Sequence, residues 1–222
     1  MRVLLDALSS SSEELAELYR PPRLPWLRVN MVSTLDGAAT GESGQSGSIN
    51  NQADKAVFDA LRAQADAIIV GAGTARTENY RVADVPLVLV SRSAQVPEQL
   101  LEAPAGKVLV ATCASSSGLA HARELLGDDQ VVVVGETEVD LAALKAALVD
   151  RGHLNLLSEG GPHLLRDLVA SGAADELCLT TVPRLIGGSH PRILGGDPVG
   201  ADLELALLLE DDGTLLARWF VA

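Results

Sequence analysis

Short runs of aliphatic residues, separated by segments with helical spacing, constrain the fold of this chain most strongly. Val131–Val134 is an unbroken run of valines, and similar apolar runs occupy residues 67–70 and 87–90, and residues 107–111 after the initial Lys107. Unbroken runs of this length suit strands that are covered on both faces. Between them lie segments such as 50–64, where apolar residues recur at helical spacing. Strands that alternate with helices in this way predict a mainly parallel sheet.

The C-terminal part of the chain predicts antiparallel pairing. Leu203–Leu209 and Leu215–Val221 resemble strands, and only Glu210–Thr214 separates them. Asp212 and Gly213 form the dipeptide that is typical of a tight hairpin turn. The predicted fold is therefore α/β: a mixed, mainly parallel sheet with helices on both faces and an antiparallel C-terminal edge.

Residues 25–222 are predicted to form one domain. A chain of 222 residues can bury a sizeable core without a disulfide or a metal ion. Aromatic residues make up only 3% of the chain, so Leu, Val, Ile and Ala must fill that core. Residues 1–24 are predicted to be a peripheral N-terminal segment, because Pro21, Pro22 and Pro25 disfavour regular structure.

The charge and the cysteines limit the possible partners and the compartment. A net charge of −13 argues against nucleic acid and anionic membranes, but a small phosphorylated ligand needs only a few local donors. Cys113 and Cys178 allow one disulfide, although two buried thiols in a reducing compartment are favoured. The chain has neither a signal-peptide pattern after Met1 nor an apolar run of ~18 residues. We expect a soluble cytoplasmic protein.

The first candidate ligand turn follows the apolar run at 67–70. Gly71 and Gly73 permit close approach of the backbone to a ligand, and Thr74 is placed to cap the next segment or to donate to a phosphate. The third glycine of the dinucleotide fingerprint is absent. An ordinary strand-to-helix turn therefore remains an alternative.

A second glycine turn follows the predicted strand at 154–157. Pro162 stands where a helix would begin, directly after Gly160 and Gly161, and Glu159 lies where open α/β sheets place ligands. The N–H groups expected to converge on an anion belong to Gly161, His163 and Leu164. The alternative is a loop whose glycines only relieve strain. Two such turns in one domain favour a bound nucleotide.

Several charged residues near predicted strand ends are further candidates. Asp36 is placed to accept a hydrogen bond from a substrate, although an Asp-Gly turn with Gly37 explains it equally simply. Arg92 follows the run at 87–90, where it is placed to bind a ribose 2′-phosphate. Other candidate phosphate ligands are Arg62, Arg76 and Arg81. The four histidines lack metal-site spacing, so no metal site is predicted.

Taken together, these motifs resemble a known family. The segments Asn30–Gly37, Ile49–Ala63, Val70–Tyr80, Ser158–Leu168 and Asp175–Gly188 occur in the order and spacing of the reductase domain of bacterial riboflavin biosynthesis. The resemblance implies a dihydrofolate-reductase-like fold, a homodimer and NADPH as cofactor. It also implies reduction of 5-amino-6-(5-phosphoribosylamino)uracil to its ribitylamino form, by hydride transfer to C1′ of the ring-opened sugar.

The resemblance also assigns roles to residues. The catalytic candidates are Asp36 and Glu159. The positions expected on the substrate side are Asn30, Ser46, Arg62 and Arg81. The positions expected to contact the cofactor are Ser33, Ser48, Gly71, Gly73, Thr74, Glu78, Arg92, Gly160, Gly161, Pro162, His163 and Leu164.

Two departures from the family pattern keep other functions open. The family often has lysine where this chain has Asn30, so a different substrate such as dihydrofolate or another pteridine is an alternative. The zinc deaminase signature of bifunctional relatives is absent, so another protein would have to perform any deamination in the pathway. A protein that binds NADPH without catalysis is the alternative of a different class.

Overall fold

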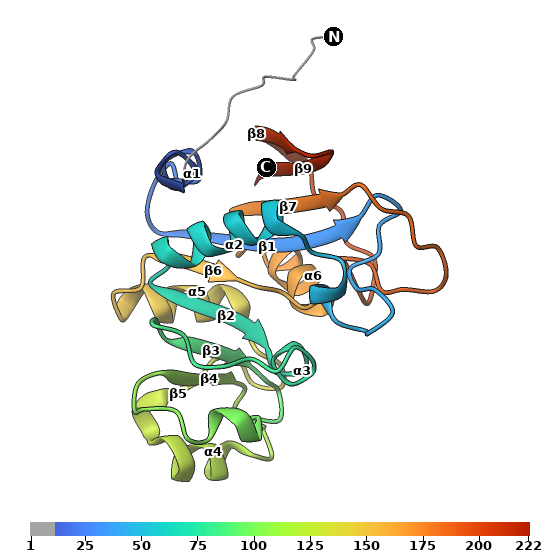
Figure 1. The fold of residues 1–222 in the computed structure, drawn as a ribbon. Coiled ribbons are helices and arrows are strands. Elements are labelled where there is room, and N and C mark those ends of the chain that lie inside the picture. Colours follow the sequence, from blue (N-terminus) through green and yellow to red (C-terminus); the bar gives the residue numbers. More distant parts are fainter. Residues whose placement is uncertain (1–11) are drawn as a thin grey trace.

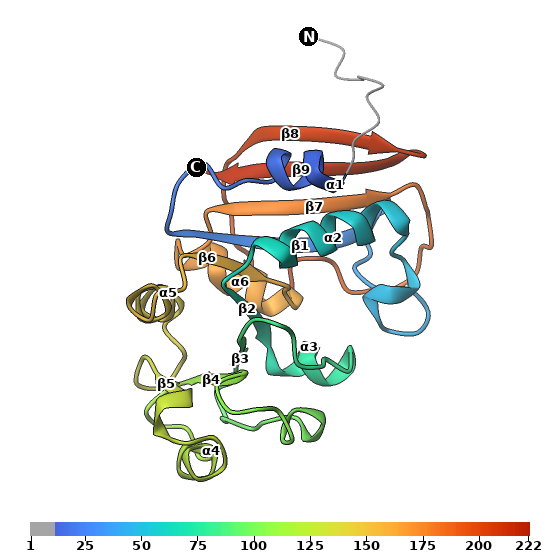
Figure 2. The ribbon, with the colours of Figure 1, turned by 60° about the vertical axis from the view of Figure 1, so that its left-hand side comes forward.

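The computed structural model describes residues 12–222, which form a nine-stranded sheet with helices on both faces (Figures 1 and 2). The strands are β1 (Trp26–Thr34), β2 (Ala67–Gly71), β3 (Leu87–Val90), β4 (Val108–Thr112), β5 (Val131–Val133), β6 (Asn155–Ser158), β7 (Glu176–Val182), β8 (Leu203–Asp211) and β9 (Thr214–Val221). The α-helices are α1 (Ser12–Leu18), α2 (Gln52–Gln64), α3 (Ala72–Thr77), α4 (Leu119–Leu126), α5 (Leu141–Asp150) and α6 (Pro162–Ala170). Short 3₁₀ turns are η1 (Ser46–Ser48), η2 (Glu98–Leu100) and η3 (Asp128–Gln130).

The strand order is β5-β4-β3-β2-β6-β1-β7-β9-β8. Strands β1 to β7 pair in parallel, whereas β9 runs antiparallel to both β7 and β8. Asp212 and Gly213 have φ of 46° and 78°, the left-handed conformation that a tight hairpin turn requires. The predicted mixed sheet, with its antiparallel C-terminal edge, is confirmed.

Each face of the sheet has its own apolar layer. Val57 and Leu61 of α2 are buried in the first layer, which also includes residues from α3 and α4. Leu144 and Leu148 of α5 belong to the second layer, together with Leu165 of α6. Helices therefore cover both faces, as the unbroken apolar runs of the central strands require.

The described part of the N-terminal segment, residues 12–24, packs against the sheet. Residues 1–11 of the predicted peripheral segment lie outside the described residues. Tyr19 is 1% exposed and belongs to the first apolar layer. The guanidinium of Arg218 on β9 donates hydrogen bonds to the carbonyls of Leu18 and Arg20. The stretch after α1 is thus held by side-chain burial and by hydrogen bonds.

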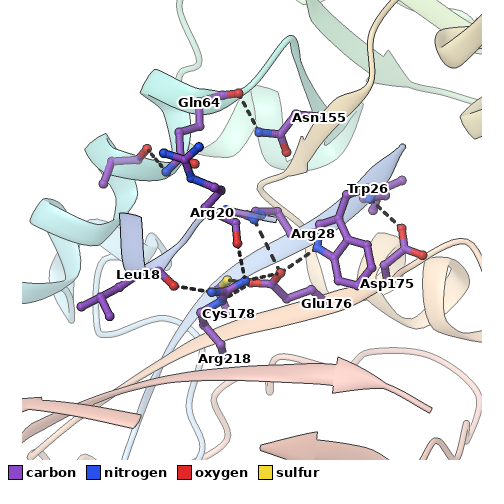
Figure 3. A network of polar contacts seen from close by, with 12 residues as sticks. Leu18, Arg20, Trp26, Arg28, Gln64, Asn155, Asp175, Glu176, Cys178 and Arg218 are labelled. Atoms are coloured by element: carbon purple, nitrogen blue, oxygen red, sulfur yellow. Dashed lines mark hydrogen bonds and ion pairs between the residues drawn. The ribbon is translucent and has the colours of Figure 1, made fainter. Parts of the chain in front are cut away.

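A buried cluster of charges lies where β1 and β7 begin (Figure 3). Glu176 is fully buried and accepts from Arg218 Nε and Nη2 at 2.9 and 3.1 Å, and from Trp26 Nε1 at 2.7 Å. Arg28, 1% exposed, places Nη2 3.6 Å from the same carboxylate. Burial raises the pKa of Glu176, but Arg218 and Arg28 outweigh it and keep that pKa below its ordinary value.

Two local expectations have clear outcomes. Helix α3 begins at Ala72 with Gly71 as its N-cap residue, so Thr74 lies inside the helix and the prediction that it caps the helix is wrong. Cys113 and Cys178 are buried and unpaired, which confirms the favoured alternative of two thiols.

Candidate functional site

The two predicted glycine turns meet at one edge of the sheet. They follow β2 and β6, which are neighbouring parallel strands. Gly71 N donates a hydrogen bond to Gly160 O at 3.1 Å. A Cβ atom on Gly161 would lie 2.2 Å from Thr74 Oγ1, so only glycine permits this contact. The strand order thus joins two turns that lie far apart in the sequence.

The second turn leads directly into α6, which has Pro162 in its first turn. Gly161 has φ of 29° and is the N-cap residue, without a side-chain cap. The first N–H groups of a helix have no acceptor within the helix, and the helix dipole favours negative charge there. His163 and Leu164 lie in this first turn, and Gly195 N donates to Pro162 O at 3.2 Å. This edge of the sheet therefore fits an anionic group.

Glu159 is the centre of a buried polar cluster. Arg62 Nε and Nη2 donate to its two carboxylate oxygens at 2.6 and 2.7 Å, and the Tyr80 hydroxyl donates to Oε2 at 2.7 Å. The Glu159 side chain is 2% exposed, whereas that of Arg62 is 32% exposed. Burial, together with the Glu159 charge, raises the pKa of Tyr80 well above its ordinary value. Tyr80 was missed as a site residue, since nothing in the local pattern links it to Glu159.

The loop before α2 joins the end of α3. Ser46 N donates to Glu78 Oε1 at 2.8 Å, and Gln45 Nε2 donates to the carbonyl of Thr77 at 2.6 Å. Ser48 Oγ accepts from Gly41 N at 3.0 Å. The structure therefore joins Ser46, a predicted substrate position, to Glu78, a predicted cofactor position, and Ser48 lies in the same loop as Ser46.

Two buried oxygens beneath α2 have no hydrogen-bond partner. One is Oδ1 of Asn30 on β1, and the other is Oδ1 of Asp54 in the first turn of α2. The two residues are 8% and 6% exposed. Asp54 was not predicted as a site residue. Its signal in the sequence is a carboxylate at helical spacing with the buried residues Val57 and Leu61.

Asp36 joins two loops. Its carboxylate accepts from Thr34 Oγ1 at 2.5 Å, and from the N–H groups of Ile186 and Gly187 at 3.1 and 2.7 Å. These hydrogen bonds, with that of Thr34 the strongest influence, lower the pKa of Asp36 to about 2. The side chain is exposed, and it connects the end of β1 to the loop that follows β7.

Three further predicted residues are not among the hydrogen-bond partners of Glu159 in the described part of the chain. Arg81 is exposed. Arg92 follows β3, beside β2, and its side chain is 76% exposed with Nη1 3.9 Å from Glu138 Oε1. Ser33 is buried near the end of β1. Within residues 12–222, no group of three or more His, Cys, Asp or Glu side chains is arranged to hold a metal ion. No helix among the same residues has the length and apolar character to cross a bilayer.

The low pKa of Asp36 predicts how stability depends on pH. The folded state keeps Asp36 ionised down to about pH 2, whereas an unfolded aspartate has a pKa of about 3.9. The stabilisation by Asp36 is therefore present above pH 4 and is lost as the pH falls toward 2. We expect the difference in urea midpoint between the wild type and Asp36→Asn to be larger at pH 6 than at pH 2.5. An equal difference at both values contradicts this assignment.

Comparisons with known proteins agree with this arrangement. A sequence profile of the RibD C-terminal domain matches residues 25–215. A 2,5-diamino-6-ribosylamino-4(3H)-pyrimidinone 5′-phosphate reductase from Archaeoglobus fulgidus is 31% identical, over 78% of this chain and 87% of the relative. A reductase of the same name from Methanothermobacter thermautotrophicus is 29% identical, over 77% of this chain and 83% of the relative. A crystal structure of a pyrimidine reductase-like protein from Corynebacterium diphtheriae matches with a TM-score of 0.76 and 28% sequence identity. The match covers 89% of this chain and 92% of the other.

The profile spans most of the chain, and it includes both glycine turns and the Glu159 cluster. The predicted fold class and the predicted family both agree with these relatives. The chain therefore belongs to the RibD C-terminal domain family.

Proposed function

We propose that this chain is an NADPH-dependent reductase of riboflavin biosynthesis. Its substrate is a 5-aminopyrimidine with a phosphorylated ribosylamino group, and the reduced atom is C1′ of the ring-opened sugar. The observation that carries the proposal is the contact between the two glycine turns, beside the buried Glu159 cluster. The names of the relatives support this class of reaction.

The glycine turns fit the diphosphate of a dinucleotide. Gly160 and Gly161 have φ of 75° and 29°, and a Cβ on either would lie within 2.5 Å of a neighbouring side-chain atom. The backbone is thus left free to approach a ligand at Gly71, Gly73 and the first turn of α6. Arg92, beyond β3, is the proposed partner of the 2′-phosphate. When bound, NADPH supplies the hydride.

The other polar residues hold the substrate and the loops. Arg62, with both oxygens of Glu159 fixing its guanidinium, is positioned to bind a phosphate or a sugar hydroxyl, and Arg81 and Ser46 are proposed beside it. Glu159 acts by orienting Arg62 and Tyr80. Asp36 acts by holding the loop after β7 against the end of β1.

The test is an assay of NADPH absorbance with purified protein. Consumption of NADPH with a 5-amino-6-ribosylaminopyrimidine phosphate, in either its uracil or its diaminopyrimidinone form, is the expected result. Turnover with dihydrofolate alone supports the pteridine alternative. Binding of NADPH without turnover of any of these substrates supports a non-catalytic protein and contradicts the proposal.

Arg62→Lys is expected to lower kcat/KM for the substrate by about 10- to 100-fold. Lysine keeps the charge but loses the paired hydrogen bonds to Glu159, and a hydrogen bond to a charged group contributes about 1.5–3 kcal/mol. Steady-state kinetics with NADPH saturating measures the change. The control is Lys55→Gln, because Lys55 is an exposed cation on the same helix that pairs with Asp59. Unchanged kinetics in Arg62→Lys contradict the role of Arg62.

Association into a homodimer and a cytoplasmic location belong to the same proposal. On the face of β7 and β9 opposite α2, Leu177, Leu179 and Trp219 are only half-buried, and Leu215 is 37% exposed. An apolar strip on a sheet face suits contact with a second copy. Light scattering that gives twice the chain mass supports this, and a monomer mass contradicts it. The two free buried cysteines suit a reducing compartment.

A further inference from the structure

Three loops at the C-terminal edge of the parallel strands are joined by hydrogen bonds. They follow β3, β4 and β5, which lie beyond β2 in the sheet. The N–H of Ser115, after β4, donates to the carbonyl of Glu136, after β5, at 2.8 Å. The carbonyl of Arg92, after β3, accepts from Thr112 Oγ1 at the end of β4, at 3.4 Å. The loops after β3 and β5 are therefore both attached to β4 and the loop that follows it.

The loop after β5 is tightly folded. Gly135 has φ of 84°, and a Cβ on it would lie 2.2 Å from the carbonyl oxygen of Glu138. The thiol of Cys113, which is buried, donates to the carbonyl of Thr137 at 3.3 Å. The backbone that carries the Glu138 side chain is thus held in place by its neighbours.

Glu138 and Arg92 form an ion pair between two of these loops. Arg92 Nη1 lies 3.9 Å from Glu138 Oε1, and the two side chains are 76% and 79% exposed. Neither side chain has a second ion pair in the part of the chain that the structure describes. An exposed ion pair contributes little to stability. Both groups therefore remain available to a ligand that competes for either of them.

The two side chains recognise different dinucleotides. A carboxylate accepts a hydrogen bond from the ribose 2′-hydroxyl of NADH, whereas an arginine binds the 2′-phosphate of NADPH. The proposed diphosphate site lies at the ends of β2 and β6, and Arg92 follows β3, the neighbour of β2 on the other side. A 2′-phosphate at Arg92 has to displace Glu138, whereas a 2′-hydroxyl can donate to Glu138 and leave the ion pair intact.

We propose that Glu138 sets the cofactor preference of this site. Its carboxylate competes with the 2′-phosphate of NADPH for Arg92 and accepts a hydrogen bond from the 2′-hydroxyl of NADH. This inference rests on the proposed function, which assigns the 2′-phosphate to Arg92. The site then binds both nucleotides, and the charge at Glu138 weakens the binding of NADPH below what Arg92 alone would give.

The experiment measures the Kd of NADPH and of NADH by calorimetric titration, for the wild type and for Glu138→Gln. The variant nearly keeps the size of the side chain and removes its charge. We expect it to bind NADPH about 5-fold more tightly, which is the factor for two like unit charges 4 Å apart in water. We expect it to bind NADH about 2- to 5-fold more weakly, because an amide oxygen is a weaker acceptor than a carboxylate. The melting temperature is expected to stay the same, since the side chain is exposed.

The matched control is Glu136→Gln, which removes the same charge from the same loop. Glu136 is exposed, and no ion pair joins it to a cation within residues 12–222. A charge that acts only at long range affects both nucleotides alike, because both contain the diphosphate. We therefore expect Glu136→Gln to change the two Kd values in the same direction, and by less than ~2-fold in physiological salt.

Opposite shifts of the two Kd values in Glu138→Gln support the inference. A wild type that binds neither nucleotide contradicts both the inference and the proposed function. A wild type that binds NADPH but not NADH overturns the inference and leaves the proposed function intact. Where the wild type binds both, the inference is also overturned if Glu138→Gln shifts the two Kd values in the same direction or shifts neither. A shared direction would mean that Glu138 acts through long-range charge or through the fold.

Discussion

Gly161→Ala is expected to lower kcat/KM for NADPH by at least ~100-fold, because displacement of a binding group by about 1 Å can cost that factor. The new Cβ would lie 2.2 Å from Thr74 Oγ1, at a point where the turns after β2 and β6 touch. Residue 161 also has φ of 29°, which a residue with a side chain rarely adopts. Either the Thr74 side chain or the backbone of the turns must therefore shift, and separation of the turns would move the N-terminus of α6. Steady-state kinetics and calorimetric titration of NADPH measure the loss.

The matched control is Gly172→Ala, just beyond the other end of α6. Gly172 has φ of 67°, and a Cβ there meets nothing within 4 Å. The control therefore costs only the left-handed backbone strain, about 1–2 kcal/mol, and kcat/KM for NADPH is expected to remain unchanged. Equal losses of NADPH affinity in both variants would mean that the glycine contact has no part in binding the cofactor.

Glu176→Ala is expected to destabilise the fold by about 3–5 kcal/mol, because it leaves two buried guanidinium groups without their carboxylate. Arg28 and Arg218 are 1% and 6% exposed, so water cannot replace the lost partner without opening the core. In a chain of this length, such a loss lowers the melting temperature by roughly 10 °C. Thermal unfolding followed by circular dichroism measures it.

Glu204→Ala is the control for this prediction. Phe220 on β9 pairs with Glu176 on one side and with Glu204 on the other, so the two glutamates hold corresponding places in neighbouring strands. Glu204 is exposed, and its removal is expected to change the melting temperature by no more than about 2 °C. If both variants melt within about 2 °C of the wild type, the buried guanidinium groups of Arg28 and Arg218 do not need Glu176 for stability, and the prediction is wrong.

Much of the fold follows from local sequence. The Asp212-Gly213 turn was predicted because these two residues readily adopt positive φ, and the valine run at 131–134 because a strand buried on both faces needs no polar side. Pro162 was correctly placed at the start of a helix, since proline is tolerated there without loss of a hydrogen bond. These backbone preferences and hydrophobic patterns depend on a few adjacent residues, so the packing of the rest of the chain changes them little.

The candidate site depended on contacts between distant segments. Tyr80 reaches Glu159 across 79 positions, and Asp36 reaches Gly187 across 151. The spacing of residues in the sequence predicts neither of these hydrogen bonds. Thr74 shows the same limit at short range, because α3 starts three residues earlier than a cap at Thr74 predicts.

By itself, the sequence determined the α/β class, the hairpin edge, the two glycine turns and the family, because backbone preference and hydrophobic period act over a few neighbouring residues. Only the tertiary structure decided that β6 lies between β2 and β1, which joins the glycine turns and places Asn30 beside Glu159 and beneath α2. Strand order is set by the packing of the whole chain, and it determines which polar groups are left buried without a partner.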